Sequence, residues 1–300
     1  MGHWRLLRAE MLRLRSRRLL RWLPFLLLAI VVGLLWQVNE QNQPLPAGAT
    51  TPAQAQCLIA QRDARASDPA ADFHCGAFGV PTETFAQTFP QQISTIAFVL
   101  FAYALLSGAT STGYEVSTGS LSTWLMFEPR RLRVMASKCL AAALWMLPPS
   151  ILTLGSYAAA SWAIHVHYGR GGQMTADDWL HLSAIAGRIV LLTATIAAVG
   201  AAVTLLVRYT GAAVAILSGW AVMELLFPQL DSVSWLLLPN IKGWMLGGFS
   251  YEAITCSTPT GACTMQMLLL PFGHSTLYLS TIACSLFILA AVVFKRRDIS

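Results

Sequence analysis

Six cysteines, two closely spaced histidines and a glutamate inside an apolar run are the residues of this chain that could bind a metal, react or change charge. His165 and His167 are one residue apart, as in some metal sites, but their side chains would diverge on a helix and no acidic or cysteine partner adjoins them. The sequence also lacks the H-E-x-x-H and G-x-S-x-G motifs of metalloproteases and serine hydrolases. We therefore expect no metal site, no cofactor and no catalytic residue in this chain.

Glu224 lies late in an apolar run over residues 212–227. An acidic side chain at bilayer depth costs about 2.5–3.5 kcal/mol, so it normally faces a partner or a cavity. Glu224 could therefore line a translocation pathway or gate, or it could be a glutamate at the outer interface near Pro228, within reach of water. Arg188 could pair with Glu224 or extend alone to the interface.

The cysteines fall into two groups. Cys139 and Cys284 lie within or at the edge of apolar runs, whereas the other four form two near pairs in polar segments. Two local disulfides in an oxidising compartment would explain these pairs, and free thiols or other pairings stay open as alternatives. The expected disulfide cysteines are Cys57, Cys75, Cys256 and Cys263.

Apolar helices are the elements that must position these residues. Only 11% of the residues are charged, against about 25% in typical soluble domains. Backbone polar groups cannot stay unpaired in lipid, and the alternating pattern of membrane strands is absent from the sequence. A spanning helix needs about 20 mostly apolar residues. We predict an all-α membrane protein with six transmembrane helices over residues 22–38, 93–111, 139–164, 189–207, 212–227 and 275–294.

The distribution of the 20 lysines and arginines predicts the orientation of these spans. Most of them precede the first span, follow the second span or end the chain, and few fall in the alternate segments. Because cytoplasmic segments are enriched in lysine and arginine, both termini are expected to be cytoplasmic. The net charge of +6 reflects this bias and gives no reason to expect a nucleic-acid partner.

Residues 1–21 place Trp4, Leu7, Met11 and Leu14 at helical spacing among arginines. This pattern predicts an amphipathic helix that lies in the headgroup layer and contacts membrane lipid. Contact of the same helix with a cytoplasmic partner is the alternative.

Residues 22–300 form the predicted transmembrane domain. Within it, residues 39–90 are a long, proline-rich polar loop on the outer side, expected to be a gate lid or a tolerated insertion. Residues 228–274 carry apolar pieces too short to span, which predicts short re-entrant or interfacial helices between spans five and six.

Residues 112–138 form a cytoplasmic segment with its own predicted short helix. Leu121, Trp124 and Leu125 recur at i, i+3 and i+4, so the helix would present an apolar face, and Pro129 would end it. An exposed apolar stripe of this kind needs a protein partner. The basic residues that would anchor the next span at the inner face are Arg130, Arg131 and Lys138.

The letters TGYEVSTGSLSTWLMFEPRRLRVMASK of this segment resemble the cytoplasmic loop of permeases of the type-2 ABC exporter family. That family has a glutamate, a Gly-Ser/Thr-Leu/Ile step, a leucine pair, a Pro-x-Arg step and a lysine opening the third span. The ending FKRRDIS and the basic opening helix are also similar to the ends of these permeases. The matching residues are Glu115, Gly119, Ser120, Leu121, Leu125, Pro129, Arg131 and Lys138.

The resemblance implies a permease subunit of an ATP-driven exporter in a bacterial cell membrane, forming the translocation path as a dimer, expected to be a homodimer. Two separate ATP-binding subunits would hold ATP and magnesium, since this chain has no G-x-x-x-x-G-K-S/T phosphate-binding loop. Glu115 could instead pair with nearby arginines. A structural or regulatory membrane subunit and a polytopic membrane enzyme are the alternative functions. The residues implied in coupling to the ATP-binding subunits are Glu115, Gly119, Ser120, Leu121, Trp124 and Leu125.

Overall fold

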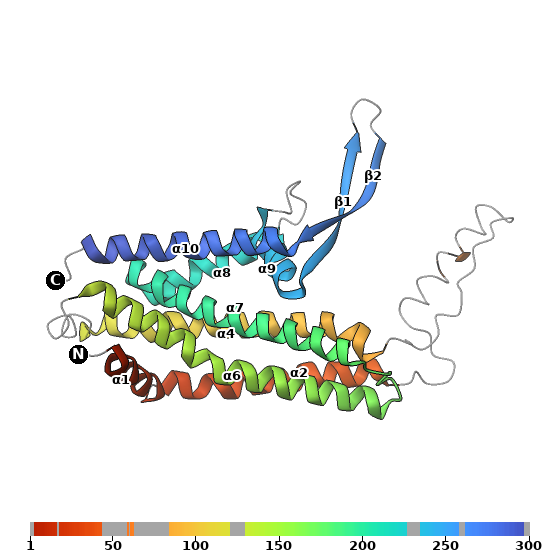
Figure 1. The fold of residues 1–300 in the computed structure, drawn as a ribbon, viewed down its shortest axis with the longest axis horizontal. Coiled ribbons are helices and arrows are strands. Elements are labelled where there is room, and N and C mark those ends of the chain that lie inside the picture. The colour runs from red at the N-terminus through yellow and green to blue at the C-terminus, as the bar shows by residue number, and fades with distance from the viewer. Residues whose placement is uncertain are drawn as a thin grey trace.

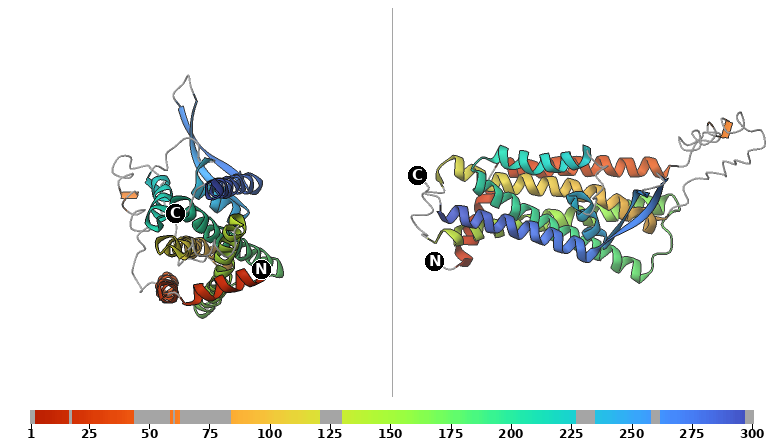
Figure 2. Two further views of the ribbon diagram at one scale, coloured as in Figure 1. Left: turned by 90° about the vertical axis from the view of Figure 1, so that its left-hand side faces the viewer. Right: turned by 90° about the horizontal axis from the view of Figure 1, so that it is seen from above.

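The computed structural model describes residues 3–16, 18–43, 59, 61–62, 84–120, 130–226, 235–257 and 262–296. This part of the chain is a bundle of long helices with one β-hairpin (Figure 1). The long helices run side by side along the longest axis of the molecule (Figure 2). They are α2 (Arg18–Asn42), α4 (Phe85–Ser117), α6 (Arg131–His167), α7 (Ala176–Val207) and α10 (Phe272–Arg296).

Within the described ranges, five helices are long and apolar enough to cross a membrane, and they correspond to the first, second, third, fourth and sixth predicted spans. The fifth predicted span corresponds to α8 (Thr210–Leu226), an apolar helix of 17 residues, shorter than the roughly 20 residues that a span usually takes. The structure thus confirms a mainly helical chain with five helices able to span a membrane.

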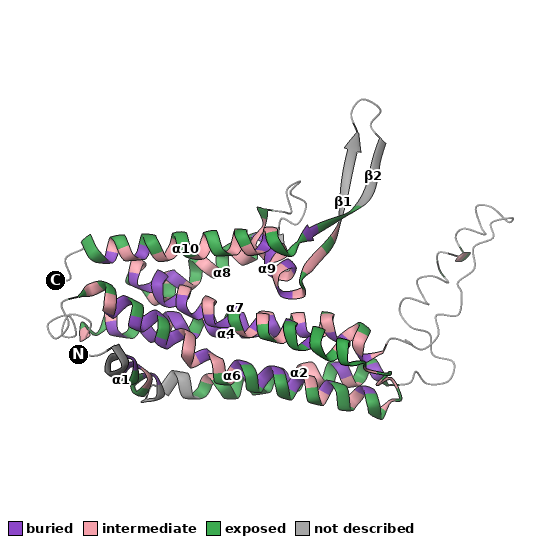
Figure 3. Cartoon of the chain, viewed as in Figure 1, coloured by how far each residue is buried: buried purple, intermediate pink, exposed green. Residues whose placement is uncertain are grey.

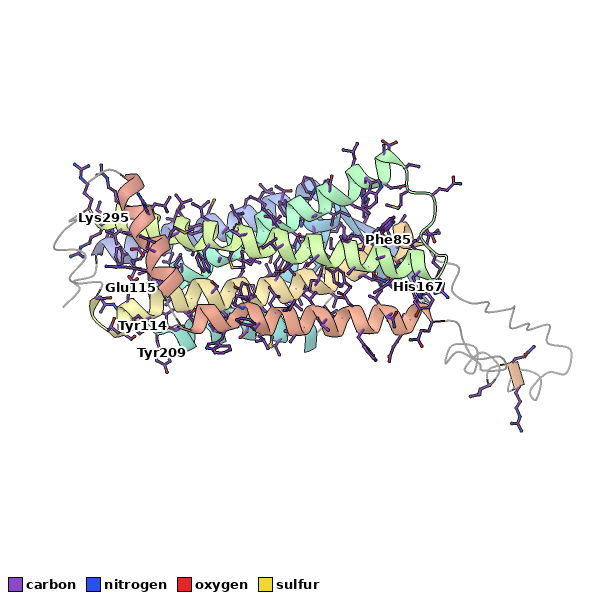
Figure 4. The ribbon with its side chains drawn as sticks, turned by 90° about the horizontal axis from the view of Figure 1, so that it is seen from below. Phe85, Tyr114, Glu115, His167, Tyr209 and Lys295 are labelled. Atoms are coloured by element: carbon purple, nitrogen blue, oxygen red, sulfur yellow. The ribbon has the colours of Figure 1, made fainter. Side chains whose placement is uncertain are left out.

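The two ends of the bundle differ. Helix α1 (His3–Ser16) and the last turn of α10 lie at the end that carries Glu115 and Lys295, which we call the α1 end (Figure 4). Phe85 and His167 lie at the opposite end, toward which the hairpin is displaced, and we call this the hairpin end.

Helix α4 begins earlier and ends later than the second predicted span. At its start the backbone N–H of Thr84 donates to Gln87 Oε1 at 3.0 Å, and Pro90 is accommodated in the second turn. At its other end the helix continues through Glu115, until Gly119 adopts a φ of 69°, a conformation that favours glycine. Both ends of α4, which were expected to be loop, are therefore helical.

Small residues let α4 and α7 pack closely. A Cβ atom on Gly108 of α4 would lie 2.0 Å from the carbonyl oxygen of Ala197 in α7, so no side chain fits there without moving backbone. A Cβ atom on Gly200 of α7 would lie 3.0 Å from the carbonyl oxygen of Leu105, a tight contact but a less severe one. Membrane helices commonly associate through small residues in this way. Buried residues are concentrated where α4, α6 and α7 meet (Figure 3).

The segment over residues 228–274 departs most from the prediction. It holds α9 (Leu237–Leu246) and an antiparallel hairpin of β1 (Gly248–Ser257) and β2 (Ala262–Pro271), so the all-α prediction is wrong here. The strands contain aromatic and β-branched residues, which favour extended structure. Pairing the two strands satisfies backbone groups that the prediction had assigned to short helices. The hairpin projects away from the bundle (Figure 1).

Candidate functional site

A buried ion cluster at the α1 end joins three helices. Lys138 Nζ of α6 donates to Glu10 Oε1 of α1 at 3.0 Å and to Glu115 Oε2 of α4. The three side chains are 3%, 7% and 4% exposed, respectively, so the contacts are shielded from solvent. Charge-assisted hydrogen bonds in such a setting are stronger than neutral ones.

The amphipathic pattern of α1 explains how Glu10 reaches this cluster. Leu7, Glu10 and Leu14 recur at i, i+3 and i+7 and so share one face of the helix. The two leucines pack with Ala141 of α6, which brings the carboxylate between them to Lys138, one turn away on the same helix. The face of α1 that was expected to contact lipid therefore packs at this point against the bundle.

Helix dipoles do not account for the position of Glu115. It lies in the last turn of α4, where exposed backbone carbonyls disfavour a negative charge. Burial of a carboxylate is also costly unless it is paired and hydrogen-bonded. The ammonium group of Lys138 supplies that pairing, so the cluster depends on contact between helices and not on the local geometry of α4.

The structure brings together two residues that the sequence analysis had assigned to separate roles. Glu115 was predicted to couple to an ATP-binding subunit or to pair with arginines, and its ion-pair partner here is Lys138. Lys138 was predicted to anchor the third span at the membrane surface, but it is buried in the cluster. The sequence analysis missed Glu10 as their partner. The available signal was that Glu10 is the sole acidic residue among the first 21 residues.

The remaining predicted coupling residues lie next to this cluster or outside the described residues. Gly119 ends α4, and the Ser120 hydroxyl group donates to the Glu115 carbonyl oxygen at 3.5 Å. Arg130 is exposed and immediately precedes α6, which Arg131 begins. Leu121, Trp124 and Leu125 lie outside the described residues, so the short helix predicted for them stays a prediction.

Glu224 has a different environment, at the start of α9. Its carboxylate accepts hydrogen bonds from the backbone N–H groups of Leu237 and Leu238 at 2.6 and 2.7 Å, and from Trp220 Nε1 at 2.5 Å. The first N–H groups of a helix have no partner within the helix, and the helix dipole favours a negative charge there. Glu224 therefore caps α9, while its predicted role in a pathway or gate stays a prediction.

Arg188 of α7 lies at the opposite end of α9 from Glu224. Its guanidinium group donates to the carbonyl oxygen of Met245 at 3.5 Å and lies over the ring of Phe272, 4.9 Å from the centroid. A cation is favourable at a helix C-terminus for the same reason that an anion is favourable at its N-terminus. Glu224 and Arg188, which the sequence analysis considered as a possible ion pair, thus contact the two opposite ends of α9.

His165 is a buried core residue. Its Nδ1 lies 2.8 Å from the Ser161 carbonyl oxygen, and its Nε2 lies 3.1 Å from Thr88 Oγ1, which links α6 to α4. Phe85 contacts the ring edge to face. Among the described residues, no group of three His, Cys, Asp or Glu side chains is placed to hold a metal ion.

The hairpin register bears on the predicted disulfides. The backbone pairing of β1 with β2 sets Cys256 directly opposite Cys263. The structure does not describe their side chains, so this disulfide stays a prediction. Cys57 and Cys75 lie outside the described residues. Cys139 is a buried free thiol and Cys284 an exposed one.

Comparisons of this chain with protein-family models and with curated protein sequences find no match. The likeness to type-2 ABC exporter permeases therefore depends on the sequence resemblance alone.

Proposed function

We propose that this chain is the membrane permease subunit of an ATP-driven exporter of the type-2 ABC class. In this proposal two copies form the translocation path, and two separate ATP-binding subunits supply the ATP and magnesium chemistry. Both termini and residues 112–138 face the cytoplasm of a bacterial cell. The chain itself is not an enzyme.

The observation that carries the proposal is the contact between Lys138, Glu115 and Glu10. Glu115 and Lys138 lie near the two ends of the segment that resembles the coupling loop of these permeases. Both are buried in one cluster with α1, at the end of the bundle that also carries the last turn of α10. A cytoplasmic loop that serves only as a tether has no need for such an anchorage.

This cluster suggests how movement would pass from the ATP-binding subunits into the membrane. A force on the segment between Gly119 and Arg130 acts on the ends of α4 and α6, which the ion pair joins to each other and to α1. Packed elements of this kind move as rigid bodies when an interface is displaced. Closure of the ATP-binding subunits would then displace α1, α4 and α6 together.

The test is affinity purification of the tagged chain from its native membrane in mild detergent. We expect a soluble protein carrying a G-x-x-x-x-G-K-S/T motif to co-purify in stoichiometric amount. The triple variant Leu121→Asp, Trp124→Asp, Leu125→Asp should lose this partner because it removes the apolar face.

Ile59→Asp is the control for that experiment, since Ile59 is exposed and lies outside residues 112–138. It should retain the ATP-binding partner. Recovery of the wild-type chain without any such partner would overturn the proposal in favour of a non-transporting membrane subunit. Retention of the partner by the triple variant would overturn the assignment of the coupling helix.

A further inference from the structure

A cavity of about 310 Å³ opens at the hairpin end, between α2 and α4. Its α2 wall includes Gln37 and Gln41, one helical turn apart. Its α4 wall places Thr88, Gln91, Gln92 and Thr95 at i, i+3, i+4 and i+7, a spacing that puts all four on one face of the helix. Leu34 and Val38 of α2 and Tyr157 of α6 also line it.

Hydrogen bonding within this cavity is incomplete. Gln92 accepts from the hydroxyl group of Ser161 at 2.9 Å, and Thr88 contacts His165. By contrast, Gln37, Gln41 and Gln91 are exposed, and within the part of the chain that the structure describes their side-chain amides form no hydrogen bond. These three amides therefore keep their donors and acceptors available to a ligand.

Tyr157 adds a hydroxyl group to the polar lining of the cavity. Its side chain is only 2% exposed and packs against the ring of Phe89, with the ring centroids 6.4 Å apart. Among the described residues its hydroxyl group has no hydrogen-bonding partner, although it lines the cavity. The hydroxyl group is not one of the enclosed polar atoms that lack a partner, so the cavity leaves it accessible as a donor and an acceptor. A ligand in the cavity would supply a hydrogen-bonding partner.

The lining also limits the charge of that ligand. Among the described residues it contains leucine, valine, glutamine, threonine and tyrosine, and no carboxylate, ammonium, guanidinium or imidazole group that could neutralise a charged ligand. A charged ligand would lose hydration without gaining a counter-charge. A primary amide offers a donor and an acceptor side by side, which complements the same arrangement in another amide.

We propose that this cavity binds a small, uncharged ligand that carries amide groups, such as a short stretch of peptide backbone. Its volume lies at the lower end of the range for small-molecule sites, which is about 300–1,000 Å³. Binding at this site needs neither ATP nor an ATP-binding partner, so the proposal stands apart from the proposed function.

The test measures binding of the blocked tripeptide acetyl-Ala-Gly-Ala-amide to the purified chain in lipid nanodiscs, by saturation-transfer NMR, with empty nanodiscs as the blank. We expect saturable binding. The same tripeptide with free charged termini should bind at least about tenfold more weakly, because the described part of the lining offers no counter-charge. Failure of the blocked tripeptide to bind saturably would overturn the proposal.

Three variants locate the site. The double variant Gln37→Leu, Gln91→Leu should weaken binding by about tenfold, and Tyr157→Phe by about threefold to tenfold, since each change removes hydrogen bonds to the ligand. Gln173→Leu, an exposed glutamine outside the cavity, is the matched control and should bind as the wild type does. Unchanged binding by the double variant would overturn this location. Saturable binding of maltose in place of the tripeptide would overturn the amide assignment.

Discussion

The two ends of the helix bundle use polar side chains in opposite ways. At the α1 end, one ammonium group pairs with two carboxylates in a buried cluster. At the hairpin end, four glutamines and two threonines line an open cavity, and three of those amides form no hydrogen bond among the described residues. Satisfied polar groups fasten helices, whereas unsatisfied ones are available to bind.

Helix α4 carries part of both regions. Gln91 and Glu115 are separated by 24 positions on it, which corresponds to about 36 Å along the helix axis. A substitution at the α1 end should therefore change the stability of helix packing, and a substitution at the hairpin end should change ligand binding. The two effects should overlap little. Each of the following predictions tests this separation.

The largest effect is expected for Lys138→Met. The uncharged methionine would leave the carboxylates of Glu10 and Glu115 buried without the ammonium group that bridges them. The free energy of unfolding should fall by about 3–5 kcal/mol. Chemical denaturation in detergent micelles, followed by circular dichroism, measures this change. Lys295→Met, at an exposed position of the same end, should change stability by less than about 0.5 kcal/mol, and an equal loss in both would contradict the buried cluster.

Gly108→Val tests the close packing of α4 on α7. This packing keeps α4, which carries part of both regions, in place within the bundle. The added side chain would meet the carbonyl oxygen of Ala197, which cannot move without its helix. We expect a loss of about 1–3 kcal/mol in the same denaturation experiment. Gly155→Ala in α6 is the matched control, since nothing lies within 4 Å of the added Cβ atom, and it should not destabilise the chain.

Glu224→Gln tests a carboxylate outside the ion cluster, at the start of α9. The neutral amide keeps one acceptor but loses the favourable interaction with the helix dipole, at a cost of about 1 kcal/mol. Amide hydrogen exchange at Leu237 and Leu238 should become faster. The control is Glu40→Gln, because Glu40 also accepts from a tryptophan four residues earlier but is exposed. Unaltered exchange at both leucines would show that Glu224 does not cap α9.

The smallest effect on stability is expected for Gln91→Leu in the cavity. Its amide forms no hydrogen bond among the described residues, so the unfolding free energy should change by less than about 0.5 kcal/mol. Gln92→Leu, the adjacent position, removes a hydrogen bond to Ser161 and should cost about 1 kcal/mol. An equal loss of unfolding free energy in the two variants would contradict the distinction between residues that stabilise helix packing and residues that are available to bind a ligand.

Some of this architecture was predictable from composition. Runs of apolar residues predicted six spans, five of which correspond to long helices in the described part of the chain, because the requirement for about 20 apolar residues is local and needs no knowledge of the fold. Their ends were less accurate. The start of α4 depends on Thr84 and Gln87, and its end on Gly119, so these boundaries follow from capping and not from hydropathy.

The hairpin was not predicted, because isolated strands are marginal and their stability comes from pairing. The strand pairing sets Gly248 opposite Pro271. A hydropathy profile shows these residues only as two unrelated interruptions of apolar runs. The ion cluster was missed for a related reason. Lys138 meets one partner 23 positions away and another 128 positions away, and no spacing rule connects residues at that distance.

The sequence alone determined that this chain has a strongly apolar, mainly helical fold, where its five long helices lie, and which residues carry charge. Hydropathy and charge belong to each residue, so they can be summed along the chain. Only the tertiary structure decided that Glu10, Glu115 and Lys138 satisfy one another and that Glu224 and Arg188 hold opposite ends of α9. It also decided that, within the described part of the chain, Gln92 is hydrogen-bonded whereas the amides of Gln37, Gln41 and Gln91 are not. Hydrogen-bond satisfaction is a property of several helices at once, and it arises only when they pack.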